Sequence, residues 1–425
     1  MILEIINNKK IAILGAGLTG QAMADWFLKY NNQVYIFDDK YNKSIVNYVL
    51  NHKFKNNINL IVNPKYSFVF DIFDAVILSP SFKLDKDYIV SRNNYSNFYT
   101  ELDYFYPFIQ DKQIFSVTGT NGKTSTVKLF AKLLENFNRK VFLGGNVGVP
   151  IVYCLEKNYD TVVLELSSYQ LFYTKTFKTD YSILLNLTPD HLKWHKDFKE
   201  YANSKLKLID FTNKVSYVHA DFNKYLKKEL NISIFDVNSP IKINKNKINK
   251  DKLMFFVNFI PVIDIMLNLG MIEEDIINTI NRIEWVKYRL TEKRVVDNLF
   301  INDSKSTNID STVFAIKNYQ NSILILGGDD KGLDYTSFIN EFKKVKIKKI
   351  IVFGGLKNKL FEILKNDFNI EKFNDLREVF IYLKSINIKN EKILFSPSSS
   401  SFDLYDNYVK RGEHFDLLVG EFFEQ

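Results

Sequence analysis

The chain has 425 residues, of which 46% are apolar and 25% are charged, and this balance is typical of a folded globular protein. A disordered protein is thereby excluded, and the length predicts two to four domains, with three as the central expectation. The 57 basic and 49 acidic residues leave a net charge of +8. Lys, Asn, Ile, Phe and Tyr are abundant together, which indicates a codon bias rather than a basic groove, so we expect no nucleic acid among the partners.

One cysteine, Cys154, excludes disulfides within the chain and metal sites made of cysteine alone. The longest apolar stretch, residues 253–269, is interrupted by polar residues and a proline. It is predicted to form a buried helix, because a membrane span needs about 20 mostly apolar residues. The first residues lead directly into a strand pattern without a signal segment. We therefore expect a cytoplasmic protein that makes no membrane contact.

Strand-like and helix-like segments alternate along the whole chain in three blocks, as in parallel βαβ units. The second block opens at KQIFSVTGTNGKT and the third near Arg294. The prediction is an α/β protein of three domains, each a mainly parallel sheet with helices. They are a Rossmann-like domain at residues 1–98, a central P-loop ATPase-like domain at 99–290 and a second Rossmann-like domain at 291–425.

The strongest motif is a glycine-rich loop between a β-branched strand and a helix, Ser116-Val-Thr-Gly-Thr-Asn-Gly-Lys-Thr124. Such a loop directs backbone N–H groups and the positive end of a helix at phosphate oxygens. Lys123 would bridge the terminal phosphates, and the Thr124 hydroxyl would reach Mg²⁺. Val117 replaces the usual first glycine, but the order of strand, Gly-Lys-Thr and helix favours phosphate binding over a chance turn.

A second glycine motif, Gly15-Ala-Gly17-Leu-Thr-Gly20, follows the first predicted strand, and Asp38 ends the next one. The spacing fits a dinucleotide fingerprint. The glycines by themselves show only that a backbone approaches a diphosphate closely. An NAD-dependent oxidoreductase, a site for another nucleotide diphosphate and a tight turn without a ligand are the alternatives at this point.

Acidic and histidine side chains follow two further predicted strands of the central block. Glu165 ends one strand, and Asp190 and His191 come after the next. Both segments should emerge beside the P-loop at the carboxyl edge of the sheet, where α/β proteins bind ligands. A carboxylate and an imidazole beside a triphosphate could form part of a Mg²⁺ shell, although a single histidine is more often a helix cap or a hydrogen-bonded residue.

Three polar segments of the third block also follow predicted strands, and they cover residues 301–308, 326–332 and 396–401. Hydroxyl groups and lysines on adjacent strand ends suit an anionic substrate. The alternative is ordinary turn chemistry, because Gly, Asp and Ser are common turn residues.

Taken in order, the segments TGTNGKT, GGNVGVP, LELSSYQL, NLTPDHL, NDSKSTN, LGGDDKG and FSPSSSSFD resemble the Mur ligase family over nearly the whole chain. The resemblance implies an ATP-dependent amide ligase of peptidoglycan precursor synthesis, which adds D-glutamate to UDP-N-acetylmuramoyl-L-alanine through an acyl phosphate. The three domains would bind the UDP substrate, ATP and the amino acid in that order, in a monomer whose partners are these small molecules. A related Mur or folylpolyglutamate-type ligase with another amino acid is the first alternative, and an NAD-dependent oxidoreductase is the second.

The resemblance also implies roles for the residues at matching positions. Contacts to ATP would come from Gly119, Thr120, Asn121, Gly122, Lys123, Thr124, Ser125, Arg289, Asp303 and Lys305. Two Mg²⁺ ions would be organised by Thr124, Glu165, His191 and Lys205. The UDP substrate would contact Leu18, Thr19, Asp38, Asn146, Ser167 and Gln170, and D-glutamate would contact Thr307, Lys331 and Ser401. The residues expected to carry catalysis are Lys123, Asn146, Glu165, His191 and Lys205.

Lys205 matches a lysine that family members carry as a carbamate, a two-oxygen anion that a hard cation accepts. Residue type alone predicts a surface position instead, because a helical lysine is nearly always exposed. The family's pattern is altered at three places, near the expected contacts to adenine, to ATP and to the UDP diphosphate: Val257 and Pro261, Lys287-Tyr288, and Ser81.

Overall fold

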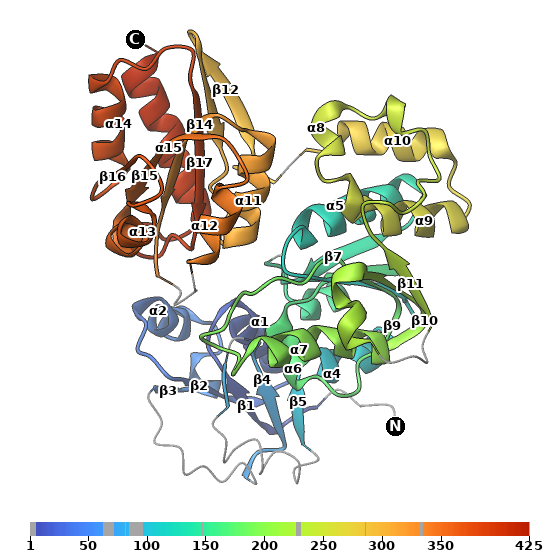
Figure 1. Ribbon diagram of the computed structural model, residues 1–425. Coiled ribbons are helices and arrows are strands. Elements are labelled where there is room, and N and C mark those ends of the chain that lie inside the picture. The colour runs from blue at the N-terminus through green and yellow to red at the C-terminus, as the bar shows by residue number, and fades with distance from the viewer. Residues whose placement is uncertain are drawn as a thin grey trace. The chain divides into compact units, whose positions relative to one another are not determined.

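The computed structural model describes residues 6–62, 72–80, 82–84, 97–146, 148–226, 231–284, 286–330 and 335–424. Three sheets follow one another along the chain, and helices accompany each of them (Figure 1). The chain forms two compact units, residues 1–187 with 199–283 and residues 188–198 with 284–425. The first unit contains the first two sheets, and the second unit contains the third.

The first sheet has the order β3-β2-β1-β4-β5, and all its strand pairs are parallel. Its central strands are almost entirely buried, as expected for a parallel sheet covered on both faces. The strands are β1 (Lys10–Leu14), β2 (Gln33–Asp38), β3 (Ile58–Val62), β4 (Ala75–Leu78) and β5 (Phe98–Thr100). The α-helices of this part are α1 (Leu18–Leu28), α2 (Lys43–Asn51) and α4 (Glu101–Phe105).

The second sheet has the order β11-β10-β9-β6-β8-β7 and is also parallel throughout. Its strands are β6 (Gln113–Thr118), β7 (Val141–Gly145), β8 (Thr161–Glu165), β9 (Thr179–Leu184), β10 (Thr212–His219) and β11 (Ile232–Phe235). The α-helices are α5 (Lys123–Asn136), α6 (Ser168–Tyr173), α7 (Phe198–Asp210), α8 (Lys250–Leu253), α9 (Ile260–Asn268) and α10 (Glu273–Arg282). Helix α5 packs on β7 and β8, and α9 and α10 pack on α5.

The single buried helix predicted over residues 253–269 is wrong in its continuity. Helix α8 ends at Leu253, a 3₁₀ helix covers Phe256–Phe259, and α9 begins at Ile260. Pro261 lies in the first turn of α9, where its missing N–H leaves no hydrogen bond unmade. The predicted burial holds in part: Phe256, Ile263 and Met266 are buried, whereas Leu253, Val257 and Leu267 are half-buried.

The third sheet has the order β12-β13-β17-β14-β15-β16, and only the pair β12–β13 is antiparallel. Phe380 of α14 and Phe415 of α15 cover one face, where Phe415 stacks on Phe395 with ring centroids 4.6 Å apart. The strands are β12 (Thr291–Val295), β13 (Asn298–Asn302), β14 (Ser322–Gly327), β15 (Ile347–Phe353), β16 (Ile370–Lys372) and β17 (Lys392–Ser398). The α-helices are α11 (Ile309–Asn318), α12 (Ser337–Phe342), α13 (Lys357–Leu364), α14 (Leu376–Ser385) and α15 (Tyr408–Phe423).

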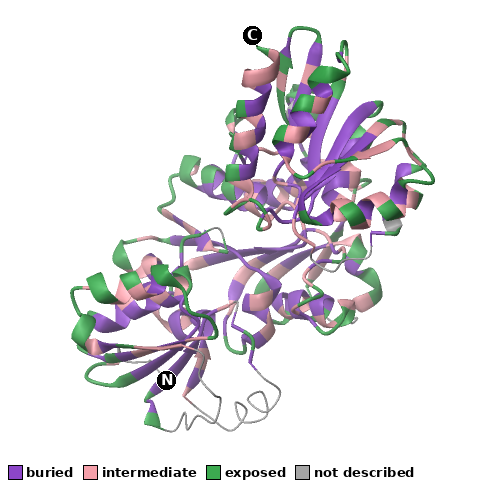
Figure 2. Ribbon diagram, turned by 90° about the vertical axis from the view of Figure 1, so that its left-hand side faces the viewer, coloured by how far each residue is buried: buried purple, intermediate pink, exposed green. Residues whose placement is uncertain are grey.

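These sheets confirm the predicted α/β class with three mainly parallel sheets. In each sheet the strands are mostly buried while the helices expose one side (Figure 2). The first sheet ends with β5 at Thr100, and the exact limits of the three predicted domains stay a prediction. Among the residues that the structure describes, no helix is both long and apolar enough to cross a membrane.

Candidate functional site

The P-loop lies between β6 and α5, as the sequence predicts. Gly119 and Gly122 have φ angles of +150° and +84°, in the region that favours glycine. A Cβ atom on Gly122 would lie 2.4 Å from the Asn258 side-chain nitrogen, and one on Gly119 would lie 2.9 Å from Cβ of Leu185. Both positions therefore require glycine, and the loop has the backbone form of a phosphate cradle.

Asn186, which follows β9, makes hydrogen bonds to the backbone of the P-loop. Its Oδ1 accepts from the Asn121 N–H at 2.7 Å, and its Nδ2 donates to the Asn121 carbonyl at 2.9 Å. The Asn186 carbonyl accepts from the Thr120 N–H at 3.1 Å. The sequence analysis missed this residue, although its place at the end of the strand beside β6 could have indicated it.

Thr124, Glu165 and Asn146 converge at the ends of neighbouring elements. Glu165 ends β8 and is only 2% exposed. Its Oε2 accepts from the Thr124 hydroxyl at 2.8 Å, and its Oε1 accepts from Asn146 Nδ2 at 2.7 Å. The structure thus brings together a hydroxyl and a carboxylate, which are oxygen ligands that Mg²⁺ prefers.

Lys205 lies on α7 and is only 1% exposed, so the surface position predicted from residue type alone is wrong. Its Nζ donates to the Gly119 carbonyl at 2.8 Å. Lys123 Nζ donates to the same carbonyl at 2.8 Å and to the Thr120 carbonyl at 2.9 Å. Two ammonium groups therefore meet on one oxygen atom, an arrangement in which like charges repel.

Ser167 and Gln170 form a capping box at the start of α6. Gln170 Oε1 accepts from the Ser167 N–H at 2.9 Å and from the Ser167 hydroxyl at 3.0 Å. Gln170 Nε2 donates to Oε1 of Glu101 at 2.7 Å. Burial raises the pKa of Glu101 to about 7, although the hydrogen bond from Gln170 opposes this rise. The sequence analysis missed Glu101, because its helix carries no motif.

The glycine loop of the first sheet is explained only partly by packing. A Cβ on Gly20 would lie 1.9 Å from the Gly15 carbonyl oxygen, and one on Gly15 would lie 2.9 Å from Cβ of Ser79. A Cβ on Gly17 would have no atom of the described residues within 4 Å. Asp38 Oδ2 accepts from the N–H of Ala16 at 2.8 Å, so this carboxylate orders the loop.

Leu18 and Thr19 open helix α1 directly after this loop. Leu18 is 73% exposed and Thr19 is half-buried. An exposed leucine directly after a glycine loop is available for contact with a ligand. The contact of both residues with the UDP substrate stays a prediction.

The second unit has its own cluster around Asp303, directly after β13. Burial raises the pKa of Asp303 to about 6, while Arg289 and the hydroxyls of Ser306 and Ser396 act to lower it. Burial lowers the pKa of the half-buried Arg289, and Asp303 acts to raise it. Lys305 Nζ lies 4.2 Å from the centroid of the Tyr408 ring.

Arg411 of α15 joins two of the polar segments predicted for the third block. It is fully buried, and its guanidinium donates to Ser304 Oγ at 3.1 Å, to the Ser304 carbonyl at 2.9 Å and to the Ser400 carbonyl at 3.1 Å. These contacts hold the loop that contains the half-buried Thr307 to the one that contains the buried Ser401. The corresponding strands β13, β17 and β14 are neighbours, as predicted. Lys331 and Ser81 lie outside the described residues.

His191 belongs to the segment of residues 188–198, which groups with the second unit. Its φ is +57°, its N–H donates to Oδ1 of the buried Asp190 at 2.8 Å, and its Nε2 lies 3.6 Å from Oδ2 of the same residue. Within the described part of the chain, no three His, Cys, Asp or Glu side chains gather as a metal site. The proposed role of His191 as a metal ligand stays a prediction.

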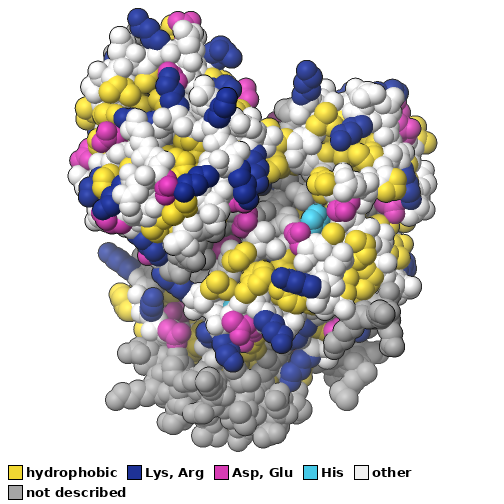
Figure 3. All heavy atoms as spheres, in the orientation of Figure 1, with side chains coloured by type: hydrophobic (Ala, Val, Ile, Leu, Met, Phe, Trp, Pro, Cys, Tyr) yellow, Lys and Arg dark blue, Asp and Glu magenta, His cyan; other side chains and the backbone are white. Residues whose placement is uncertain are grey.

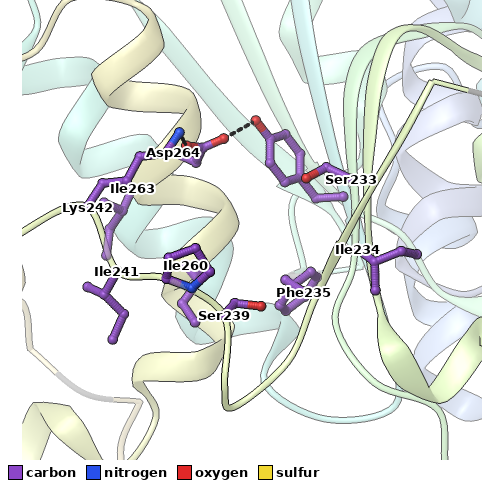
Figure 4. Close-up of a pocket in the computed structure, with 11 residues that line it drawn as sticks. Ser233, Ile234, Phe235, Ser239, Ile241, Lys242, Ile260, Ile263 and Asp264 are labelled. Carbon is purple, nitrogen blue, oxygen red and sulfur yellow. Dashed lines mark hydrogen bonds and ion pairs between the residues drawn. The ribbon is translucent and has the colours of Figure 1, made fainter.

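A small pocket of about 140 Å³ lies between β11 and α9 (Figure 4), and none of the predicted site residues lines it. The Tyr217 hydroxyl donates to Asp264 at 2.7 Å, and Lys242 pairs with the same carboxylate. The pocket is smaller than typical small-molecule sites, which occupy about 300–1,000 Å³. On the face drawn in Figure 3, Lys and Arg side chains are spread among acidic and apolar ones.

Comparison with known proteins assigns this arrangement to a class. Residues 117–272 match the model of the Mur ligase middle domain. The chain is 35% identical to a UDP-N-acetylmuramoylalanine–D-glutamate ligase of Petrotoga mobilis, over 96% of this chain and 99% of the relative. A ligase of the same name from Helicobacter pylori is 30% identical, again over 96% and 99% of the two chains. The chain therefore belongs to the Mur ligase family, and the protein is an enzyme of the ligase class.

Solved structures show the same fold. The MurF ligase of Thermotoga maritima in complex with ADP aligns with a TM-score of 0.60 and 15% identity, over 92% of this chain and 95% of that one. The UDP-N-acetylmuramate–alanine ligase MurC of Thermotoga maritima aligns with a TM-score of 0.57 and 18% identity, over 97% and 99%. At such low identity these structures establish the fold of the chain, and the roles of its residues have to be argued from the chain itself.

Proposed function

We propose that the protein joins D-glutamate to UDP-N-acetylmuramoyl-L-alanine with hydrolysis of ATP, in the synthesis of the peptidoglycan precursor. The relatives that bear this activity in their names match nearly the full chain. The observation that carries the proposal is the P-loop with Lys123 and Thr124 at its helix and Glu165 beside it. A nucleotide triphosphate is the ligand that this loop is built to hold.

The donors present in the structure fit Mg²⁺ and ATP. Mg²⁺ is usually held by one or two carboxylates together with substrate phosphates, so a crowded acidic cluster is unnecessary. Thr124 and Glu165 would supply the protein oxygens, and His191 would be added from the segment that precedes α7. The bound ion would neutralise charge on the phosphates. Residues 119–125 would surround the phosphates, and Arg289, Asp303 and Lys305 would contact the rest of ATP.

We further propose that Lys205 carries a carbamate. Lys205 and Lys123 both donate to the Gly119 carbonyl, so a neutral or anionic group in place of one ammonium would remove their repulsion. A buried lysine readily loses its proton, which is the form that takes up CO₂. The carbamate would then add an anionic oxygen ligand beside the P-loop for a second Mg²⁺ ion.

The UDP substrate would be bound at the glycine loop, and the amino acid would be bound at the strand ends of the third sheet. The UDP group would lie on Gly17, Leu18 and Thr19, in the loop that Asp38 orders. The muramoyl peptide would contact Asn146, Ser167 and Gln170. The amino acid would be held by Thr307, Lys331 and Ser401, since hydroxyls and a lysine suit its two carboxylates.

The chain's residues have defined tasks in this reaction. Lys123 offsets the charge that moves as the γ-phosphoryl group passes to the substrate carboxylate, and the P-loop N–H groups orient that group. The amine of D-glutamate then attacks the acyl phosphate, and phosphate leaves. Asn146 holds the Glu165 carboxylate in place through its 2.7 Å hydrogen bond, so that the carboxylate keeps its orientation.

Phosphate release from ATP tests this function directly. We expect release only when UDP-N-acetylmuramoyl-L-alanine and D-glutamate are both present, and omission of either should abolish it. Replacement of D-glutamate by L-alanine, L-lysine or L-glutamate distinguishes related ligases, which would accept one of these instead. A nicotinamide-fluorescence titration tests the oxidoreductase alternative. An oxidoreductase should bind the nicotinamide cofactor, and the UDP substrate should not compete with it.

We also propose that the enzyme acts as a cytoplasmic monomer on these small molecules. The glycine loop with Asp38 and α1, and the P-loop with Glu165 and α5, are each made by one chain. Sedimentation equilibrium of the purified protein across a range of concentrations tests the monomer. A mass of twice the chain would overturn it.

A further inference from the structure

Glu101 is a buried carboxylate that the proposed reaction does not use. It begins α4, directly after the last strand of the first sheet, and it is 2% exposed. Its Oε1 accepts from Gln170 Nε2 at 2.7 Å, whereas its Oε2 has no hydrogen-bond partner among the described residues. A buried acid with an unsatisfied oxygen costs stability, so a purely structural role explains it poorly.

The contacts of Glu101 fix the orientation of the Gln170 amide. In its ionised form Glu101 can only accept hydrogen bonds, and it then requires the NH₂ group of Gln170 to point toward α4. The Gln170 carbonyl oxygen must then face the other way, where it accepts from the N–H and the hydroxyl of Ser167. One carboxylate on α4 therefore determines how the amide of Gln170 on α6 is turned.

The same chain of contacts determines the polarity of the Ser167 hydroxyl. Its hydrogen is committed to Gln170 Oε1 at 3.0 Å, and its oxygen already accepts from the Gln170 N–H at 3.3 Å. A serine oxygen has two lone pairs, so it can accept one further hydrogen bond but can donate none. If the Gln170 amide were reversed, its NH₂ group would face Ser167, and the hydroxyl hydrogen would be free to donate.

We propose that Glu101 is a positioning residue that, through Gln170, makes Ser167 an acceptor for an N–H group of the muramoyl peptide substrate. This inference rests on the proposed function, in which Ser167 and Gln170 contact that substrate. The amide N–H of the acetamido group and the N–H of the alanyl residue are the donors of the required chemistry. Glu101 begins the helix that directly follows β5 of the first sheet, and its contact with Gln170 connects this part of the first unit to α6.

The test compares Glu101→Met with Glu101→Gln. Methionine fills a similar volume without an acceptor, and replacement of a buried charge by an apolar side chain is often tolerated. Calorimetry should show that Glu101→Met weakens binding of UDP-N-acetylmuramoyl-L-alanine about tenfold and leaves ATP binding unchanged. Glu101→Gln retains a carbonyl that can accept from Gln170, and its affinity should stay within about threefold of the wild type.

Asp103→Asn provides the matched control on the same helix. Asp103 is buried too, but its Oδ1 accepts from the backbone N–H groups of Lys175, Thr176 and Phe177, at 3.0, 2.7 and 3.2 Å. This variant should lower the melting temperature while leaving both affinities unchanged. Equal affinities of wild type and Glu101→Met, or an equal loss in Asp103→Asn, would overturn the inference. Wild-type protein that fails to bind the UDP substrate at all would instead overturn the proposed function.

Discussion

The hydroxyl of Thr124 donates a 2.8 Å hydrogen bond to Oε2 of Glu165, and this bond joins the first turn of α5 to the end of β8. The two oxygens come from elements that the sheet places side by side, because β6 and β8 are adjacent. A cation that binds both oxygens would replace the shared proton of this bond. The bond therefore marks the place where the P-loop and the acidic strand end would act on the same ion.

Thr124→Val should raise the Mg²⁺ concentration needed for half-maximal phosphate release about tenfold. Valine has nearly the shape of threonine, so the loss of one oxygen ligand is the main change, and a factor of ten corresponds to about 1.4 kcal/mol. A titration of phosphate release with Mg²⁺ measures the effect. Thr279→Val on α10 is the control, since the Thr279 hydroxyl donates to the Asp275 carbonyl of its own helix. An unchanged Mg²⁺ requirement in Thr124→Val would remove this hydroxyl from the ion's ligands.

Asn186→Leu should weaken ATP binding more than it weakens binding of the UDP substrate. Its side chain makes two hydrogen bonds to the backbone of Asn121, and their loss leaves the P-loop free to adopt other conformations. We expect KM for ATP to rise about tenfold or more, while KM for the UDP substrate changes by less than about threefold. Equal effects on both KM values would indicate a general loss of structure instead.

Gly17→Ala and Gly20→Ala separate a ligand contact from a packing requirement. A Cβ on Gly17 would lie more than 4 Å from every other atom in the part of the chain that the structure describes, and the residue has φ −67° and ψ −173°, which any amino acid adopts. Gly17→Ala should therefore keep the melting temperature close to that of the wild type and weaken binding of the UDP substrate about tenfold or more. Gly20→Ala should destabilise the protein itself, because its Cβ would clash with the Gly15 carbonyl. Unchanged substrate affinity in Gly17→Ala would favour a simple turn.

The buried Glu101 predicts a defined pH dependence of stability. Its pKa is raised from 4.5 to about 7 in the folded state, so the folded protein binds this proton more tightly than the unfolded chain does. Its favourable contribution is complete below about pH 4.5 and is lost as the pH rises to about 7, by roughly 3 kcal/mol. Urea unfolding at pH 5 and pH 8 should show a steeper loss in the wild type than in Glu101→Gln. Asp303, whose pKa is raised to about 6, is present in both proteins and cancels in the comparison.

The alternation of strands and helices and the P-loop could be predicted from sequence because they depend on local patterns. The motif at Lys123 specifies strand, loop and helix within a few residues, and buried strands show as continuous apolar runs. Glu101 and Arg411 could not be found in this way, and only its place at a strand end could have indicated Asn186. Each acts through a contact to a residue distant in sequence, Arg411 to Ser304 for example, and such contacts exist only once the sheets are assembled.

The break in the apolar stretch 253–269 shows the same limit in the fold itself. The apolar stretch predicted a buried helix, and its burial is only partial; the stretch also could not show that the chain changes from a 3₁₀ helix to an α-helix at Ile260. Pro261 was visible in the sequence as an interruption. Its position in the first turn of α9, rather than inside a longer helix, depends on where the preceding residues pack.

Lys205 offers the sharpest test of the metal site. Its Nζ is buried beside that of Lys123, because both donate to the Gly119 carbonyl. If Lys205 carries a carbamate, Lys205→Ala should be nearly inactive, since an anionic ligand and a counter-charge for the phosphates are lost. Acetate should restore part of the activity by entering the vacated space as a two-oxygen anion, while chloride at equal ionic strength should not.

Two further variants decide how this result is interpreted. Lys205→Arg should be inactive and resist rescue, because guanidinium stays protonated and cannot take up CO₂. Lys207→Ala, two residues along the same helix, is the control. The Nζ of Lys207 donates to the carbonyl groups of Phe172 and Thr174, so its loss should lower stability, and acetate should not change the activity of this variant. Steady-state phosphate release with and without acetate measures all three variants. Full activity of Lys205→Ala would show that this buried lysine only supports the Gly119 carbonyl, and the second Mg²⁺ ion would then lack its ligand.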